Sequence, residues 1–286
     1  MTWIDAHVHA WDQDDAIWIR GRVAALSGEF PLAALKHVAT DNRVSHALLV
    51  QAAQSDAETR RCIRMAEDDD FVAGVVGWVD LHSPQLDAQI DALRVSPKLV
   101  GFRPLPHSTF GPGWWGETRT IKGLRSLARS GNIVDILAFS SELADVARAV
   151  AGADGLRTVL NHGGRPNIMC GGWNQWAAQL RAVAVSGEVY CKCSGLVERA
   201  GIEWTFNSIH PYLGTLLEVF GTERLMFASN WPVLNIASTY RNWIETVLEA
   251  FVQLGLDPSE VNAIMGGNAA RCYALAQASE RPPPAG

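Results

Sequence analysis

The chain has 286 residues, of which 48% are apolar and 19% are charged, and this composition is typical of a folded globular protein. Its formal net charge of −6 argues against nucleic acid or an anionic membrane surface as the main partner. There is no signal-peptide pattern, no apolar run of roughly 18 residues and no Cys-x-x-Cys pair, so we expect a cytoplasmic protein with reduced thiols and no membrane span.

Short apolar runs alternate with longer stretches of helical period along the chain. The runs are rich in Val, Leu and aromatic residues and are bounded by Gly, Pro, Asp or Asn, as is typical of buried strands. The eight predicted strands are WIDAHVH (3–9), SHALLVQ (45–51), AGVVGWVD (73–80), LVGFRP (99–104), IVDILAF (133–139), RTVLNH (157–162), VYCKCS (189–194) and RLMFAS (224–229).

Several of the intervening stretches carry helix start signals. Ser55 and Glu58 are spaced as a capping box, and Asp257 followed by Pro258 is a second start pattern. Eight strands that each precede a helix predict an α/β fold with one (β/α)8 TIM barrel over residues 1–276. We expect residues 277–286 to be a disordered tail. A doubly wound open sheet is the alternative, but no Gly-x-Gly-x-x-Gly turn follows any strand.

In such a barrel the functional residues lie at the C-terminal ends of the strands. This rule converts the predicted strands into a set of candidate site positions. The candidates are His7, His9, Gln51, Asp80, Arg103, Phe139, His162, Lys192 and Asn230.

The first strand offers a group of alternating polar residues. Asp5, His7 and His9 are two residues apart, so in a regular strand all three face the same side, which we expect to be the barrel interior. Two neighbouring imidazoles can hold one metal ion or bind an oxyanion, and His162 is predicted to lie at the same barrel mouth. The alternative is a structural, hydrogen-bonded histidine pair.

Two cationic residues end later strands. Arg103 can clamp a carboxylate or a lactone carbonyl, or it can form an internal ion pair with Asp5 or Asp80. Lys192 lies between two cysteines in a strand and is predicted to point into the barrel, where a charge costs less than among apolar helices.

Uncharged residues complete the predicted substrate site. Gln51 ends the second strand, and Trp114 and Trp115 lie in a Gly- and Pro-rich loop after the fourth strand. Trp231 follows the eighth strand. Aromatic side chains in such positions can form the wall of a pocket for a ring-shaped substrate, or they can simply pack.

Six motifs in this order resemble the amidohydrolase superfamily: DAHVHAWD, VGWVDL (76–81), GFRP, NHGGRP, CKCSGL (191–196) and MFASNWPV (226–233). The closing GGNAARCYAL (266–275) is also similar. The resemblance is to the metal-dependent hydrolase branch that contains lactonases of sugar acids and dicarboxylic acids. It implies a (β/α)8 barrel in which His7, His9 and His162 surround the scissile bond, with a small anionic or hydroxylated lactone as substrate.

The chain departs from the family pattern at Asn230, where the resemblance implies an aspartate that activates water. An amide cannot accept that proton. Three interpretations follow. The sequence is an Asp→Asn form that has lost its base, or it is a natural hydrolase that uses His162 or a metal hydroxide as the base. Alternatively, a natural chain has diverged toward a decarboxylase-like lyase or a small-molecule binder. No histidine ends the fifth strand, so the resemblance implies at most one zinc ion, held by His7, His9 and His162, or a metal-independent reaction.

Overall fold

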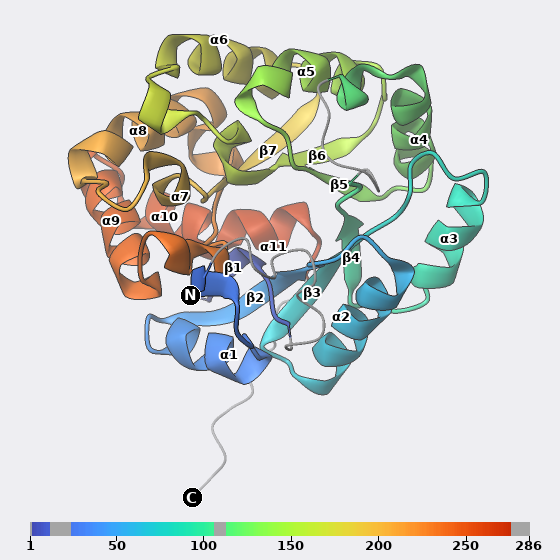
Figure 1. Cartoon of the computed structure of the whole chain (residues 1–286), viewed down its shortest axis with the longest axis horizontal. Helices are drawn as coiled ribbons and strands as arrows, with labels where there is room; N and C mark the ends of the chain where they lie inside the picture. The colour runs from blue at the N-terminus through green and yellow to red at the C-terminus, as the bar shows by residue number, and fades with distance from the viewer. Residues whose placement is uncertain (1, 12–23, 106–112, 276–286) are drawn as a thin grey trace, which may run out of the picture.

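Eight parallel strands form one sheet in the order in which they occur along the chain, and helices surround it (Figure 1). The structure, a computed structural model, describes residues 2–11, 24–105 and 113–275. The predicted (β/α)8 barrel is therefore confirmed. The predicted disordered tail, 277–286, lies outside the described residues.

Every predicted strand is present, although most are shorter than the apolar runs that predicted them. The residues lost from the C-terminal ends form the loops that carry the site. The strands are β1 (Trp3–Val8), β2 (Val44–Val50), β3 (Val72–Gly77), β4 (Leu99–Phe102), β5 (Ile133–Ile136), β6 (Arg157–Leu160), β7 (Glu188–Cys193) and β8 (Leu225–Phe227).

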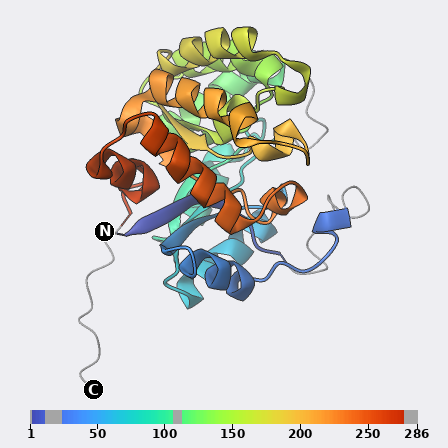
Figure 2. The same ribbon diagram turned by 90° about the vertical axis from the view of Figure 1, so that its left-hand side faces the viewer.

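The helices follow the strands, and none in the described part of the chain is long and apolar enough to cross a membrane. The α-helices are α1 (Leu32–Thr40), α2 (Asp56–Asp68), α3 (Leu86–Leu93), α4 (Thr118–Arg129), α5 (Leu143–Ala151), α6 (Trp173–Ala184), α7 (Val197–Ala200), α8 (Phe206–Arg224), α9 (Tyr240–Gln253), α10 (Pro258–Asn262) and α11 (Asn268–Cys272). The short 3-10 segments are η1 (Ala24–Leu26), η2 (Trp114–Gly116), η3 (Ser140–Glu142), η4 (Asn161–Gly164), η5 (Ile168–Cys170) and η6 (Val233–Ile236), and η7 (Ala263–Gly267) is a π-helical turn. Figure 2 shows β1, in dark blue, beside the orange and red helices of the C-terminal part.

The predicted helix starts are confirmed at one position and half confirmed at another. Asp257 caps α10 through the amides of Ser259 and Glu260, with the reciprocal bond from the Glu260 side chain. Ser55 accepts from the Glu58 amide as predicted. The Glu58 carboxylate, however, accepts from the Ala52 amide in the loop after β2 instead of closing a capping box.

The apolar core has two layers. Residues from alternate positions of the strands meet inside the barrel, among them Leu48, Val50 and Val76. The other face of the same strands packs against the helices in a larger cluster that includes Ala47 and Leu49. Strands buried on both faces read as nearly continuous apolar runs, which is why the sequence predicted them well.

The barrel closes where β8 returns to β1. An isolated parallel bridge joins Val8 to Trp231. The Asn230 amide donates to the His7 carbonyl at 2.9 Å, and the His9 amide donates to the Trp231 carbonyl at 2.8 Å. This β8–β1 seam therefore brings the first-strand histidines and the residues after β8 side by side.

A bulge in β1 breaks the expected alternation of its side chains. Asp5 pairs with Ala47 and Val8 pairs with Leu49. Between these two pairs the chain advances by three residues in β1 but by only two in β2, which is a β-bulge. Ala47 and Leu49 face the helices, which places Asp5 and Val8 on that outer face as well, whereas Ala6 belongs to the interior cluster. The prediction that Asp5 faces the barrel interior with His7 and His9 is wrong.

Asp5 instead ties the seam together from outside. Its Oδ1 accepts from the Ser229 amide at 2.9 Å and the His7 amide at 3.1 Å, and its Oδ2 accepts from the Tyr240 hydroxyl on α9 at 3.0 Å. Burial nevertheless raises the pKa of Asp5 to about 6, because desolvation outweighs these three donors.

The close fit of α4 against the loop after β3 allows a test of the packing. A Cβ atom at Gly123 would lie 2.6 Å from the Leu81 carbonyl oxygen, so we expect G123A to lower the free energy of unfolding by about 1–3 kcal/mol. At Gly214, inside α8, a Cβ would contact only Leu254, at 3.5 Å. We therefore expect G214A to raise the free energy of unfolding by up to ~1 kcal/mol. Urea unfolding of both variants measures these free energies. An equal change in G123A and G214A would contradict the close contact between Gly123 and Leu81.

Candidate active site

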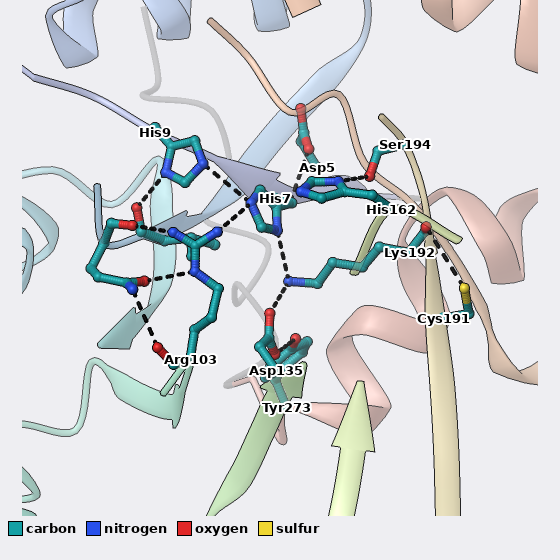
Figure 3. A network of polar contacts seen from close by, with 12 residues as sticks. Asp5, His7, His9, Arg103, Asp135, His162, Cys191, Lys192, Ser194 and Tyr273 are labelled. Carbon is teal, nitrogen blue, oxygen red and sulfur yellow. Dashed lines mark hydrogen bonds and ion pairs between the residues drawn. The ribbon is translucent and has the colours of Figure 1, made fainter. Parts of the chain in front are cut away.

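His7 and His9 point to each other at the mouth end of β1 (Figure 3). Their Nε2 atoms lie 3.3 Å apart, and the rings meet edge to face with centroids separated by 4.9 Å. His9 Nδ1 lies 2.8 Å from the Val50 carbonyl oxygen, and His7 Nδ1 lies 3.4 Å from Lys192 Nζ. The predicted histidine pair is therefore present, and it contacts β2 through Val50 and β7 through Lys192.

The hydrogen bonds of this pair assign its tautomers. Burial lowers the pKa of His9 to about 3 and that of His7 well below its ordinary value, so both rings are neutral near pH 7. A carbonyl only accepts, so His9 carries its proton on Nδ1 and its Nε2 accepts from His7 Nε2–H. His7 Nδ1 is then free to accept from Lys192. Every lone pair of the two rings has a donor.

Lys192 occupies the barrel interior, as the sequence predicted, and is fully buried. Its Nζ lies 2.5 Å from Asp135 Oδ2 on β5, and Asp135 Oδ1 accepts from the Tyr273 hydroxyl at 2.5 Å. Burial lowers the pKa of Lys192, while the Asp135 carboxylate acts in the opposite direction. The result is a buried ion pair whose cation faces His7.

Arg103 follows β4 and is held by the residue that follows β2. Its Nε donates to Gln51 Oε1 at 3.1 Å and its Nη2 to the Gln51 carbonyl at 2.5 Å, while Nη1 lies 3.4 Å from His7 Nε2. The Gln51 amide in turn donates to the Arg103 carbonyl. The predicted substrate contact at Gln51 is thus not supported, because this buried side chain orients the guanidinium instead. An ion pair of Arg103 with Asp5 is excluded by the bulge in β1.

His162 completes the cluster from β6. It lies in η4 with a left-handed φ of 56°, and its ring centroid is 4.5 Å from that of His7. Its Nδ1 lies 2.8 Å from the hydroxyl of Ser194 at the end of β7. Burial and the cations Arg165 and Arg103 lower the pKa of His162 well below its ordinary value, so this third ring is also neutral.

Asn230 lies at the seam, after β8, where the sequence placed it. Its backbone has a left-handed φ of 63°, which asparagine adopts at lower cost than most residues. The backbone amide donates to His7, and the side-chain Nδ2 donates to Glu198 Oε1 on α7 at 2.8 Å. A carboxylate therefore lies next to the position at which the sequence resemblance implies one.

The three predicted tryptophans lie in two different places. Trp231 contacts Phe30 edge to face with centroids 5.5 Å apart, close to the seam, and is 5% exposed. Trp115 is fully buried in the outer core, and Trp114 contacts Trp115 and His82. The η2 segment that holds the last two packs on α5 and α4, so a role for them in a pocket wall is not supported.

Four side chains of the site were missed from sequence. Asp135 is a charged residue in the apolar run that forms β5, and this was a usable signal, since such a charge needs an interior partner. Arg165 lies in the NHGGRP motif, and its guanidinium carbon is 4.2 Å from the centroid of the Phe139 ring. Glu198 and Tyr273 lie in helices far along the chain from their partners, and no local pattern predicts such contacts.

The chain as a whole is similar to known proteins in both sequence and structure. Residues 4–275 match a family model described as amidohydrolase. The chain is 32% identical over 292 residues to an L-fucono-1,5-lactonase from Burkholderia multivorans, covering 97% of each chain. Two crystal structures of an amidohydrolase from the same species, one with bound HEPES and one with bound zinc, have TM-scores of 0.88 and 0.86 at 32% identity. In both comparisons 96% of this chain and 100% of the other are covered.

The buried neutral histidines give the stability of the fold a defined pH dependence. His9 has a folded pKa of about 3, below the ordinary value of 6.5, so the unfolded chain binds a proton that the folded chain does not as the pH falls through 6.5. Stability is lost in that direction, by up to ~1.4 kcal/mol per pH unit for one such group. We expect H9Q to have a shallower decline between pH 6.5 and pH 5. Urea unfolding at several pH values measures the slope, and an identical slope in both proteins would contradict the assignment.

Proposed function

The chain belongs to the amidohydrolase family, and on this premise we propose that it hydrolyses a small lactone, with water attacking the ring carbonyl carbon. The observation that carries the proposal is the cluster of neutral imidazoles and two cations, Arg103 and Lys192, at the C-terminal ends of the strands. The similarity to an L-fucono-1,5-lactonase over 97% of the chain supports this reaction class. A hydroxylated lactone of a sugar acid is the substrate class that we propose.

The proposed roles follow from charge and hydrogen bonding. When water adds to a lactone, negative charge develops on the carbonyl oxygen, and preorganised donors and cations stabilise it. Arg103, oriented by Gln51, and Lys192, held by Asp135, supply positive charge beside His7. His162 has its Nδ1 engaged by Ser194, which leaves Nε2 to contact the substrate. Trp231 is proposed to contact the sugar ring from the seam.

A divalent metal fits these residues poorly. The sequence raised His7, His9 and His162 as ligands for one zinc ion, and a related structure contains zinc. In this chain, however, the lone pairs of His7 and His9 already accept hydrogen bonds, and two cations lie 3.4 Å from the His7 ring. Within the described residues no group of three His, Cys, Asp or Glu side chains could hold a metal ion. We therefore derive no step through a metal.

The reaction itself is tested by assaying the purified protein against a panel of sugar-acid 1,4- and 1,5-lactones in a pH-stat. We expect ring opening of at least one member, and we expect H162N to lower kcat by about 10²–10³, as for loss of one oxyanion donor. His82, which contacts Thr120 and Trp114 outside the site, provides the control, and H82N should leave kcat unchanged. Decarboxylation without lactone opening would favour the lyase alternative, and tight binding without turnover would favour the binder.

The metal question has an independent test. After dialysis against EDTA and metal analysis of the protein, we expect lactone hydrolysis to continue at the original rate, because the cations Arg103 and Lys192 take the place of a Lewis acid. Loss of activity on chelation, restored by one equivalent of zinc, would show that the histidines release their hydrogen bonds to bind metal.

A further inference from the structure

Glu198 is a buried carboxylate that the sequence did not predict and that the proposed cluster of histidines and cations does not use. It lies on the short helix α7, directly after the end of β7. Its Oε1 accepts from Asn230 Nδ2 at 2.8 Å. Its Oε2 is buried and has no hydrogen-bond partner among the described residues. A buried carboxylate oxygen without a donor is unfavourable, and such groups are retained where they have a use.

The surroundings place this carboxylate at the site rather than in the outer shell of helices. Asn230, which holds it, donates its backbone amide to the His7 carbonyl. Gly195, three residues before Glu198, packs so closely on His162 that an added Cβ would lie 2.7 Å from the histidine Cβ. Glu198 is therefore held near the ends of β7 and β8, against Asn230 after β8, and the loop after β7 packs on His162 from the end of β6.

We propose that Glu198 is the general base of this enzyme, taking the part that an aspartate at position 230 plays in the family pattern. The inference rests on the proposed lactone hydrolysis. Asn230 then has a defined function: its amide donates to Oε1 and so directs Oε2 at the attacking water. In this proposal the carboxylate is at position 198 instead of position 230, and the amide of Asn230 is hydrogen-bonded to it.

The step balances without any further reactant. The water oxygen forms a bond to the ring carbonyl carbon while one water proton passes to Glu198 Oε2. The tetrahedral intermediate collapses, the bond from the carbonyl carbon to the ring oxygen breaks, and the Glu198 carboxyl returns the proton to that oxygen. The product is an open hydroxy acid, which releases one proton to solvent as its carboxyl group ionises.

The electrostatics of the site favour Glu198 over the histidines in this role. Burial, followed by the cations Arg165, Arg103 and Lys192, lowers the pKa of His162 and holds its ring neutral, which makes it a weak proton acceptor. Burial raises the pKa of Glu198, so its carboxylate is a stronger base than an exposed one, while Arg165 opposes that shift and favours the ionised form.

The test exchanges the amide and the carboxylate across their shared hydrogen bond. E198Q keeps the size of the side chain and leaves an oxygen that accepts from Asn230, but it removes the base, so we expect kcat to fall by about 10²–10⁴. In E198Q/N230D the amide and the carboxylate change places, and a base is restored in contact with the same partner. We expect this double variant to recover at least about tenfold of the loss.

Two controls separate the base from a structural effect. E203Q removes a carboxylate at an exposed position shortly after α7 and should leave kcat unchanged. Thermal unfolding of all variants checks that they fold; a purely structural role for Glu198 would lower the melting temperature of E198Q, and adding N230D would not restore turnover.

The outcomes distinguish this inference from the proposed function. If the parent protein opens no lactone of the panel, the proposed function fails, and the role of Glu198 fails with it. If the parent is active and folded E198Q retains its kcat, only the role of Glu198 is overturned. A deep loss in E198Q without recovery in E198Q/N230D also overturns the exchange.

Discussion

The β8–β1 seam is the constraint on which the rest of the site depends. Two backbone hydrogen bonds, from Asn230 to His7 and from His9 to Trp231, join the first and last strands across more than two hundred residues of chain. Asp5 supports the same seam from the outer face through Ser229 and Tyr240. Because the barrel closes at the residues of the site, the arrangement of the site depends on the closed barrel.

The bulge in β1 decides what the interior of the barrel contains. It sends the Asp5 carboxylate to the helices, so the interior receives the two imidazoles without a negative charge beside them. The nearest charges are then cations, and burial and these cations together keep His7 neutral. Negative charge comes from other elements: Asp135 on β5 offsets Lys192, and Glu198 on α7 lies against Asn230. A regular first strand would have neutralised this positive site from within.

Much of the fold could be predicted from the sequence, because parallel strands that are buried on both faces are nearly continuous apolar runs. All eight apolar runs became strands, and the rule that barrel sites lie at strand ends predicted positions that the structure brings close together: His7, His9, Arg103, His162 and Asn230. The errors have a common cause. Alternation could not reveal the bulge at Asp5, and Gln51, Trp114 and Trp115 met their partners through contacts that local patterns do not encode.

The sequence by itself determined the barrel, its strand order and the position of an amide at the end of the eighth strand, because apolar periodicity and strand-end residues are local properties. Only the tertiary structure decided what faces that amide. Glu198 is 32 residues away from Asn230 along the chain, and the two meet because neighbouring strands of a closed barrel deliver their following loops to the same edge. The contact between Asn230 and Glu198 therefore exists only in the closed barrel.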